Sequence, residues 1–197
     1  MQFANRIKGA VTQALLRALL EDSGYRIIPF GVEETWRELA QLKEQDYLAL
    51  RLPKTLRQLP DFFVSDYPIK NTWLVEVKYR KEWSDSIRDE LGSQLLEQVN
   101  HWSPLYLIVF LGGAAEQASN KTDSCMGIVR LTSENGELFV TTVEDPTPKK
   151  WSDISWKAFG RIQKVFKTLS TPKKLDEQTL RKVQKSLSQL TALDATE

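Results

Sequence analysis

The chain has 197 residues, of which 41% are hydrophobic and 27% charged, values typical of one folded domain and not of a fibrous or wholly disordered protein. The one cysteine, Cys125, excludes an internal disulfide, and the one histidine, His101, sharply limits His-rich metal sites and Ser-His-Asp triads. No apolar run approaches the ~18 residues that a membrane-spanning helix needs. We therefore expect a cytoplasmic protein with no membrane association.

Charge is unevenly distributed, although the net charge is only +1. Between residues 149 and 185 there are eleven Lys or Arg residues and three acidic residues, whereas the preceding part of the chain is acidic. A basic C-terminal quarter on an acidic body indicates a negatively charged partner, with nucleic acid as the first choice. The alternative is a solvated helical surface that happens to be basic.

The first half of the chain predicts a helix followed by strands. Apolar residues at helical spacing predict a helix over 5–23, which Gly24 ends. Residues 25–30 read as a short strand, which Pro29 makes unsuitable for the interior of a sheet. A helix over 32–45 follows, and the segment 47–60 is irregular or partly helical.

The remaining elements complete a mixed α/β pattern with a central sheet. They are strands at 61–65 and 71–80, a helix over 85–102, a strand at 105–113 buried on both faces, a hairpin over 126–143 turning at 134–136, and helices over 152–169 and 176–190. We expect a core over 1–148 and a basic helical extension, 149–197, packed on it.

The strand TWLVEVKYR carries the most informative residues. Side chains alternate across a strand, so Glu76 and Lys78 lie on one face. Two such charges on a central strand are costly unless they are paired, hydrated or bound to a ligand. Asp61 begins the preceding strand, and a hairpin between the two strands would bring it near Glu76. The alternative for Glu76 and Lys78 is an ion pair on a solvent-facing sheet surface.

Two carboxylates and a lysine at one sheet edge suit a hard divalent cation such as Mg²⁺, with Mn²⁺ as a substitute, because such ions prefer oxygen ligands. Hydrolysis of a phosphodiester uses this arrangement: a metal neutralises the phosphate and acidifies a water, which a nearby lysine positions or deprotonates. Asp61, Glu76 and Lys78 are therefore our candidate catalytic residues.

These residues resemble the motif of the PD-(D/E)XK nuclease superfamily. Pro60-Asp61 is similar to its first half and Glu76-Val77-Lys78 to its second, and the helix and strand over 8–30 resemble those of its Holliday-junction-resolvase-like branch. The resemblance spans roughly residues 5 to 112. It implies a restriction-endonuclease-like core and a metal held by Asp61, Glu76 and Val77.

The helix over 85–102 adds a further point of resemblance. A glutamine on the helix after the E-x-K motif recurs in that family, and this helix carries Gln94 and Gln98 on one stripe. We take Gln94 as the catalytic candidate. The alternative is that both glutamines lie on a helix flank and bond to backbone or water.

The first helix departs from the family pattern. Resolvase-like members often carry a glutamate there, and the corresponding position holds Gln13. Gln13 can ligate a metal or hydrogen-bond but adds no negative charge. Glu33 or Glu34 could supply the missing carboxylate, and we favour Glu34 as the metal ligand; the alternative is that both are first-turn acids of a helix.

The expected function is a Mg²⁺-dependent DNA endonuclease, a homodimer if it cuts both strands of a duplex. Lys157, Arg161 and Lys164 recur at steps of four and three on the helix over 152–169, and we expect them to follow the phosphate backbone, with Arg80 beside the site. One alternative is a nuclease-fold protein without catalysis that binds DNA or serves as an assembly subunit. Another is an unrelated α/β domain that docks on an acidic protein.

Overall fold

A computed structural model describes residues 2–31, 44–112 and 125–170, with the single residues 39, 42, 182, 185, 186 and 189. The described residues contain one seven-stranded sheet whose strands lie side by side in chain order. These strands are β1 (Arg26–Pro29), β2 (Phe62–Ser65), β3 (Thr72–Arg80), β4 (Leu105–Leu111), β5 (Met126–Glu134), β6 (Glu137–Thr141) and β7 (Lys149–Lys150).

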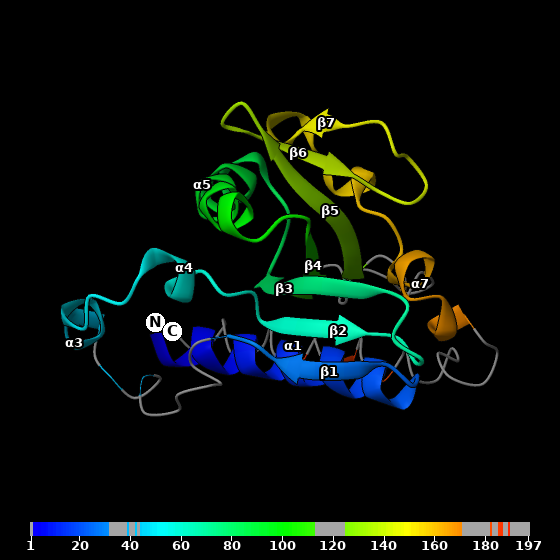
Figure 1. Ribbon diagram of the computed structural model, residues 1–197, viewed down its shortest axis with the longest axis horizontal. Helices are drawn as coiled ribbons and strands as arrows, with labels where there is room; N and C mark the ends of the chain where they lie inside the picture. The colour runs from blue at the N-terminus through cyan, green and yellow to red at the C-terminus, as the bar shows by residue number, and fades with distance from the viewer. Residues whose placement is uncertain are drawn as a thin grey trace.

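Neighbouring strands are antiparallel except β3 and β4, which are parallel. A parallel pair needs a crossover connection, and helix α5 (Asp85–His101) supplies it. The other long helix, α1 (Gln2–Asp22), lies along β1 to β3 on one side of the sheet, with α5 on the opposite side (Figure 1). The chain is therefore a mixed α/β domain with helices flanking a central sheet, as the element order predicted.

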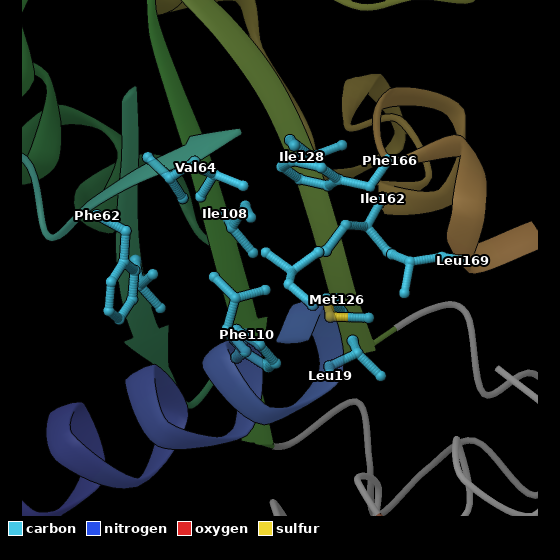
Figure 2. Close-up of a cluster of buried hydrophobic side chains, with 14 of the residues drawn as sticks. Leu19, Phe62, Val64, Ile108, Phe110, Met126, Ile128, Ile162, Phe166 and Leu169 are labelled. Carbon is cyan, nitrogen blue, oxygen red and sulfur yellow. The ribbon is translucent and has the colours of Figure 1, made fainter. Parts of the chain in front are cut away.

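The hydrophobic core has two halves, one on each face of the sheet. On the α1 side, Ile108 and Phe110 of β4 pack with residues of α1 and of the C-terminal segment (Figure 2). On the α5 side, Leu107 and Val109 pack with Leu91 and other residues of α5. The prediction that this apolar strand is buried on both faces is confirmed, because alternate side chains of β4 serve the two halves.

Local signals placed β1, β2, β3 and the β5–β6 hairpin correctly, whereas β7 lies where the sequence predicted the start of the helical extension. Pro29 ends the edge strand β1, where a missing N–H is tolerated. The hairpin of β5 and β6 turns at Asn135 and Gly136, which both have positive φ, 52° and 79°. That conformation fits a two-residue turn of the type that matches strand twist.

The continuous helix predicted over 152–169 is wrong. The structure has four short elements instead: η3 (Trp151–Asp153), η4 (Trp156–Ala158), α7 (Ile162–Val165) and η5 (Lys167–Ser170). Gly160 interrupts any helix because its N–H and C=O both bond to Ile128 of β5. The apolar stripe is real but divided, since Ile154 packs in the α5-side core and Phe166 in the α1-side core. One straight helix could not reach both faces of a sheet.

Other predictions fall partly or wholly outside the described residues. Most of the helix expected over 32–45 does so, and its last two residues belong to α3 (Glu44–Ala49). Most of the helix expected over 176–190 does as well. The segment 47–60 is partly helical as expected and includes α4 (Lys54–Arg57). Within the described part of the chain, no helix combines the length and the apolar character needed to cross a membrane.

Candidate active site

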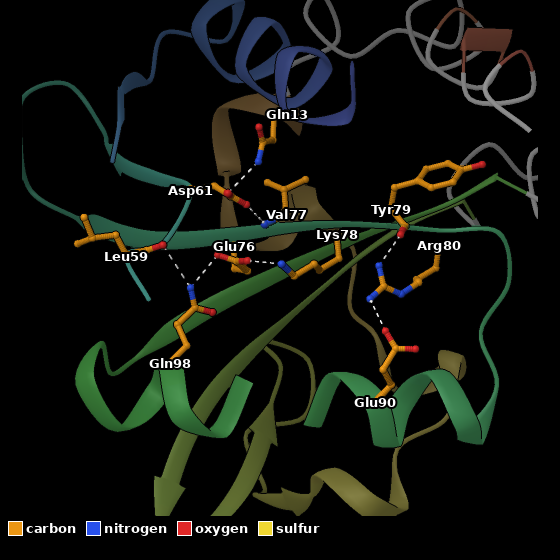
Figure 3. Close-up of polar contacts among 10 residues, drawn as sticks. All are labelled: Gln13, Leu59, Asp61, Glu76, Val77, Lys78, Tyr79, Arg80, Glu90 and Gln98. Carbon is orange, nitrogen blue, oxygen red and sulfur yellow. Dashed lines mark hydrogen bonds and ion pairs between the residues drawn. The ribbon is translucent and has the colours of Figure 1, made fainter. Parts of the chain in front are cut away.

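The pairing of β2 with β3 brings Asp61 to the second half of the motif. Phe62 pairs with Val75 in antiparallel register, so Asp61, one residue before β2, comes level with Glu76. The Asp61 carboxylate spans two elements: Oδ2 accepts the N–H of Val77 at 2.7 Å, and Oδ1 accepts Nε2 of Gln13 on α1 at 2.8 Å (Figure 3). Asp61 is thus held in place from both the strand and the helix.

Glu76 and Lys78 form a direct ion pair on the side of β3 that faces α5 (Figure 3). The side chain of Glu76 is only 7% exposed and that of Lys78 is 28% exposed. The alternative of a pair on a solvent-facing sheet surface is therefore wrong. Alternation along the strand explains the arrangement, because Val75 and Val77 fill the α1-side core while Glu76 and Lys78 face α5.

The charge of Glu76, followed by that of Asp61, raises the pKa of Lys78 above its ordinary value, against the opposing effect of burial. Lys78 therefore carries its proton at neutral pH. In the free protein it is a fixed ammonium that can hold an oxygen atom, and not a base ready to accept a proton.

The glutamine of α5 that contacts Glu76 is Gln98, one helical turn beyond the predicted Gln94. Nε2 of Gln98 donates to Oε2 of Glu76 at 2.8 Å, and it lies 3.5 Å from the carbonyl oxygen of Leu59. Gln94 is exposed, although it lines the same pocket of about 230 Å³ as Glu76 and Lys78. The sequence signal for Gln98 was its place on the same stripe as Gln94.

Other predicted site residues lie elsewhere or outside the described residues. Glu34 belongs to the part of the chain that is not described. Arg80, at the end of β3, donates to the carbonyl oxygen of Tyr79 at 2.8 Å and lies 3.6 Å from Glu90 of α5. Burial lowers the pKa of Arg80, and Glu90 opposes this effect.

The three basic residues expected on one helical face do not share one. Arg161 and Lys164 line a pocket with Arg130 of β5, and Lys164 lies 3.6 Å from Glu144. Lys157 is exposed on the separate turn η4 and does not line that pocket. The expected single basic face was wrong because the helix that would carry it does not form.

The residues present fit a divalent cation only in part. Asp61 and Glu76 offer carboxylate oxygens and Val77 a backbone carbonyl, the oxygen ligands that Mg²⁺ prefers. Each of the four carboxylate oxygens already accepts a donor, from Gln13, Val77, Lys78 and Gln98. A carboxylate oxygen has a second lone pair, so these contacts do not block a metal. Among the described residues, however, no group of three or more His, Cys, Asp or Glu is placed to hold one.

Comparisons with family models, curated proteins and solved structures give no match for this chain.

Proposed function

We propose that this protein is a Mg²⁺-dependent DNA endonuclease built on a restriction-endonuclease-like core of the PD-(D/E)XK type. The observation that supports the proposal is that the register of β2 and β3 brings Asp61 onto the backbone N–H of Val77, the residue between the paired Glu76 and Lys78. A buried carboxylate paired with a lysine is expensive for a fold that needs only a stable sheet. A second carboxylate level with it on the neighbouring strand is an arrangement that metal-dependent phosphodiester hydrolysis uses.

Each residue has a role that follows from its contacts. Asp61, Glu76 and the carbonyl of Val77 would hold the cation, which when bound supplies positive charge against the phosphate and acidifies a water. Lys78, protonated at neutral pH, orients an oxygen of the water or of the phosphate. Gln98 fixes the Glu76 carboxylate in its rotamer through the bond to Oε2. Gln94, exposed in the same pocket, faces the substrate side.

The substrate follows from the charges. Arg80 lines a pocket next to the site together with Lys78. A second pocket is lined by three further basic residues, Arg130, Arg161 and Lys164. Contacts of this kind supply affinity for a phosphate backbone with little sequence information. Because one chain carries one site, cutting both strands of a duplex calls for a homodimer.

The test is cleavage of a mixed panel of duplex, branched and single-stranded DNA with Mg²⁺, Mn²⁺ or EDTA. We expect metal-dependent cleavage by the wild type and its loss in Glu76→Gln, with DNA binding retained, because the substitution keeps shape and removes charge. Glu137→Gln is the matched control, since Glu137 is also a strand glutamate paired with a lysine, Lys150, but is half exposed. Cleavage that survives Glu76→Gln, under matched Mg²⁺, contradicts the proposal.

A second candidate function is DNA binding without catalysis. The observation that favours it is the full engagement of the carboxylate oxygens by protein donors, with the neutral Gln13 where a third carboxylate would strengthen a metal site. DNA binding without cleavage that is insensitive to Asp61→Ala selects this second function.

A further inference from the structure

A pocket of about 550 Å³ lies between α1 and the end of β3, next to the candidate active site. Three residues already described, Gln13, Val77 and Lys78, form part of its lining, so the pocket and the site share a wall. Its charged lining is Lys8, Lys78, Arg80, Lys81 and Glu90. Lys78 is already paired with Glu76, so Lys8, Arg80 and Lys81 set the charge of the lining against Glu90, whose carboxylate is 64% exposed and therefore screened by water.

Lys8 is the most unusual member of this lining. It is only 4% exposed, and its ammonium lies 5.8 Å from the ring centroid of Tyr79, within reach of a cation–π contact. An ammonium carried by a helix at the wall of an open pocket has a fixed position, so it can hold an anion in the pocket at little further cost in side-chain entropy.

The side chain of Arg80 is also held in place and partly buried. Its guanidinium bonds to the carbonyl oxygen of Tyr79, which sets its direction, and lies 3.6 Å from Glu90. A guanidinium has five N–H donors in a planar fork, so these contacts leave donors for an oxyanion. Lys8 from α1 and Arg80 from β3 therefore present preorganised cations from two rigid elements.

Gly9 forms part of the α1 wall of the pocket and places no side chain in it. A Cβ placed at Gly9 would meet no atom within 4 Å, so the space beside this turn of the helix is open. Glycine inside a helix costs about 1 kcal/mol relative to alanine. No packing contact requires glycine here, and the open space lets a ligand approach the helix backbone.

We propose that this pocket binds a phosphate of the nucleic-acid strand, next to the phosphate that is cleaved, through Lys8, Arg80 and Lys81. The inference rests on the proposed function, because the shared lining at Lys78 is what relates the pocket to the reacting phosphate. A strand seated there would be held on one side of the cut by fixed charges. The contact involves only the backbone, so it adds affinity and direction but reads no base.

The experiment compares Gly9→Glu with Gly9→Gln. The two side chains have the same shape, and both residues are good helix formers, so the fold is kept and only a negative charge differs. Binding of a fluorescent oligonucleotide is measured by anisotropy in EDTA over a range of salt, which removes cleavage from the readout. We expect Gly9→Glu to weaken binding at least tenfold relative to Gly9→Gln, with thermal unfolding of the two variants alike.

A second variant guards against a folding defect. Lys81 is exposed, so Lys81→Ala leaves the core intact, and we expect the slope of log affinity against log salt to become shallower by about 0.7 to 0.9 for the lost contact. Equal binding by Gly9→Glu and Gly9→Gln, with a wild-type salt slope for Lys81→Ala, overturns the inference.

The failure of this inference is distinguishable from the failure of the proposed function. If cleavage is metal-dependent and lost in Glu76→Gln but the Gly9 pair bind alike, the nuclease stands and the pocket is refuted. If Gly9→Glu weakens binding in a protein that cleaves nothing, the pocket stands as a phosphate site and the nuclease proposal fails.

Discussion

Replacing Lys78 by methionine tests whether the Glu76–Lys78 pair is a buried charge pair held for function. The substitution keeps most of the side-chain volume and removes the ammonium. Glu76 is then left with Gln98 as the donor to its carboxylate, in a position where its side chain is 7% exposed. The free energy of unfolding must therefore fall, because a carboxylate out of water has lost its countercharge.

The size of the loss follows from the exposure of the two partners. Breaking a fully buried pair costs about 3–5 kcal/mol, whereas an exposed pair contributes about 0–1 kcal/mol. Because Lys78 is 28% exposed, water reaches the site in its absence, and we expect a loss of about 2–4 kcal/mol. Adding Glu76→Gln removes the stranded charge, so the double variant should recover most of that loss.

Urea denaturation at neutral pH measures all three variants, with Lys150→Met as control. Lys150 pairs with Glu137, and both side chains are 53% exposed, so its loss should leave the free energy of unfolding almost unchanged. The pKa of Lys78 is raised, so its contribution is full below the ordinary value of 10.5 and is lost as pH rises through the folded-state pKa. A loss below about 1 kcal/mol for Lys78→Met, with no recovery in the double variant, would show that the pair is solvated.

Two further predictions concern metal and DNA. Gln13→Glu replaces the amide that donates to Asp61 by a third carboxylate. Calorimetry should find Mn²⁺ bound roughly tenfold more tightly or better, because ligand charge sets the affinity for hard cations. Unchanged Mn²⁺ affinity would place Gln13 outside the metal site. Arg161→Ala and Lys164→Ala should each make the slope of log duplex affinity against log salt shallower, by up to about 0.9 per lost contact, because both residues line one pocket. The effect of Lys157→Ala should simply add to theirs, because Lys157 lies on another turn. Wild-type slopes in all three variants would make these residues ordinary surface.

The features of the candidate site that depend on neighbouring residues in the sequence could be predicted. Strand alternation alone put Glu76 and Lys78 on one face, and the short connection between two strand-like segments put Asp61 near them. The structure adds that both strands belong to one sheet in the register that sets Asp61 level with Glu76. The burial of the pair depends on α5, which the residues of β3 do not encode.

The helical pattern of the sequence could not decide between Gln94 and Gln98. Both lie on one helical stripe, and only the rotation and depth of α5 against β3 decide which reaches Glu76. The structure favours Gln98, whose amide meets the carboxylate, while Gln94 stays at the rim. The rotation is set by packing elsewhere on α5, such as the close approach of Trp151 to Gly92, where a Cβ would come within 2.8 Å of the indole nitrogen.

The segment 152–169 failed for a related reason. Its apolar residues recur at a helical period, yet they satisfy two half-cores on opposite faces of the sheet. Periodicity indicates which residues are buried, but it does not indicate which part of the core they pack against. Lys8 escaped notice for the converse reason, because nothing in the sequence distinguishes a buried lysine from the exposed lysines that are far more common.

Gln13 sets the balance between the two candidate functions. A side-chain amide has a donor and an acceptor end, and here the donor end faces Asp61. Rotating the amide by half a turn presents its oxygen to the same place without moving α1, so the residue can satisfy Asp61 alone and can also contribute an oxygen to a cation held by Asp61. Glutamate would make only the second state favourable, and alanine neither. Under the proposed function, a site with glutamine at this position would be organised before a cation arrives and would bind that cation more weakly than a site with three carboxylates. The phosphate of a bound strand would then add negative charge, so metal affinity should rise when DNA is present.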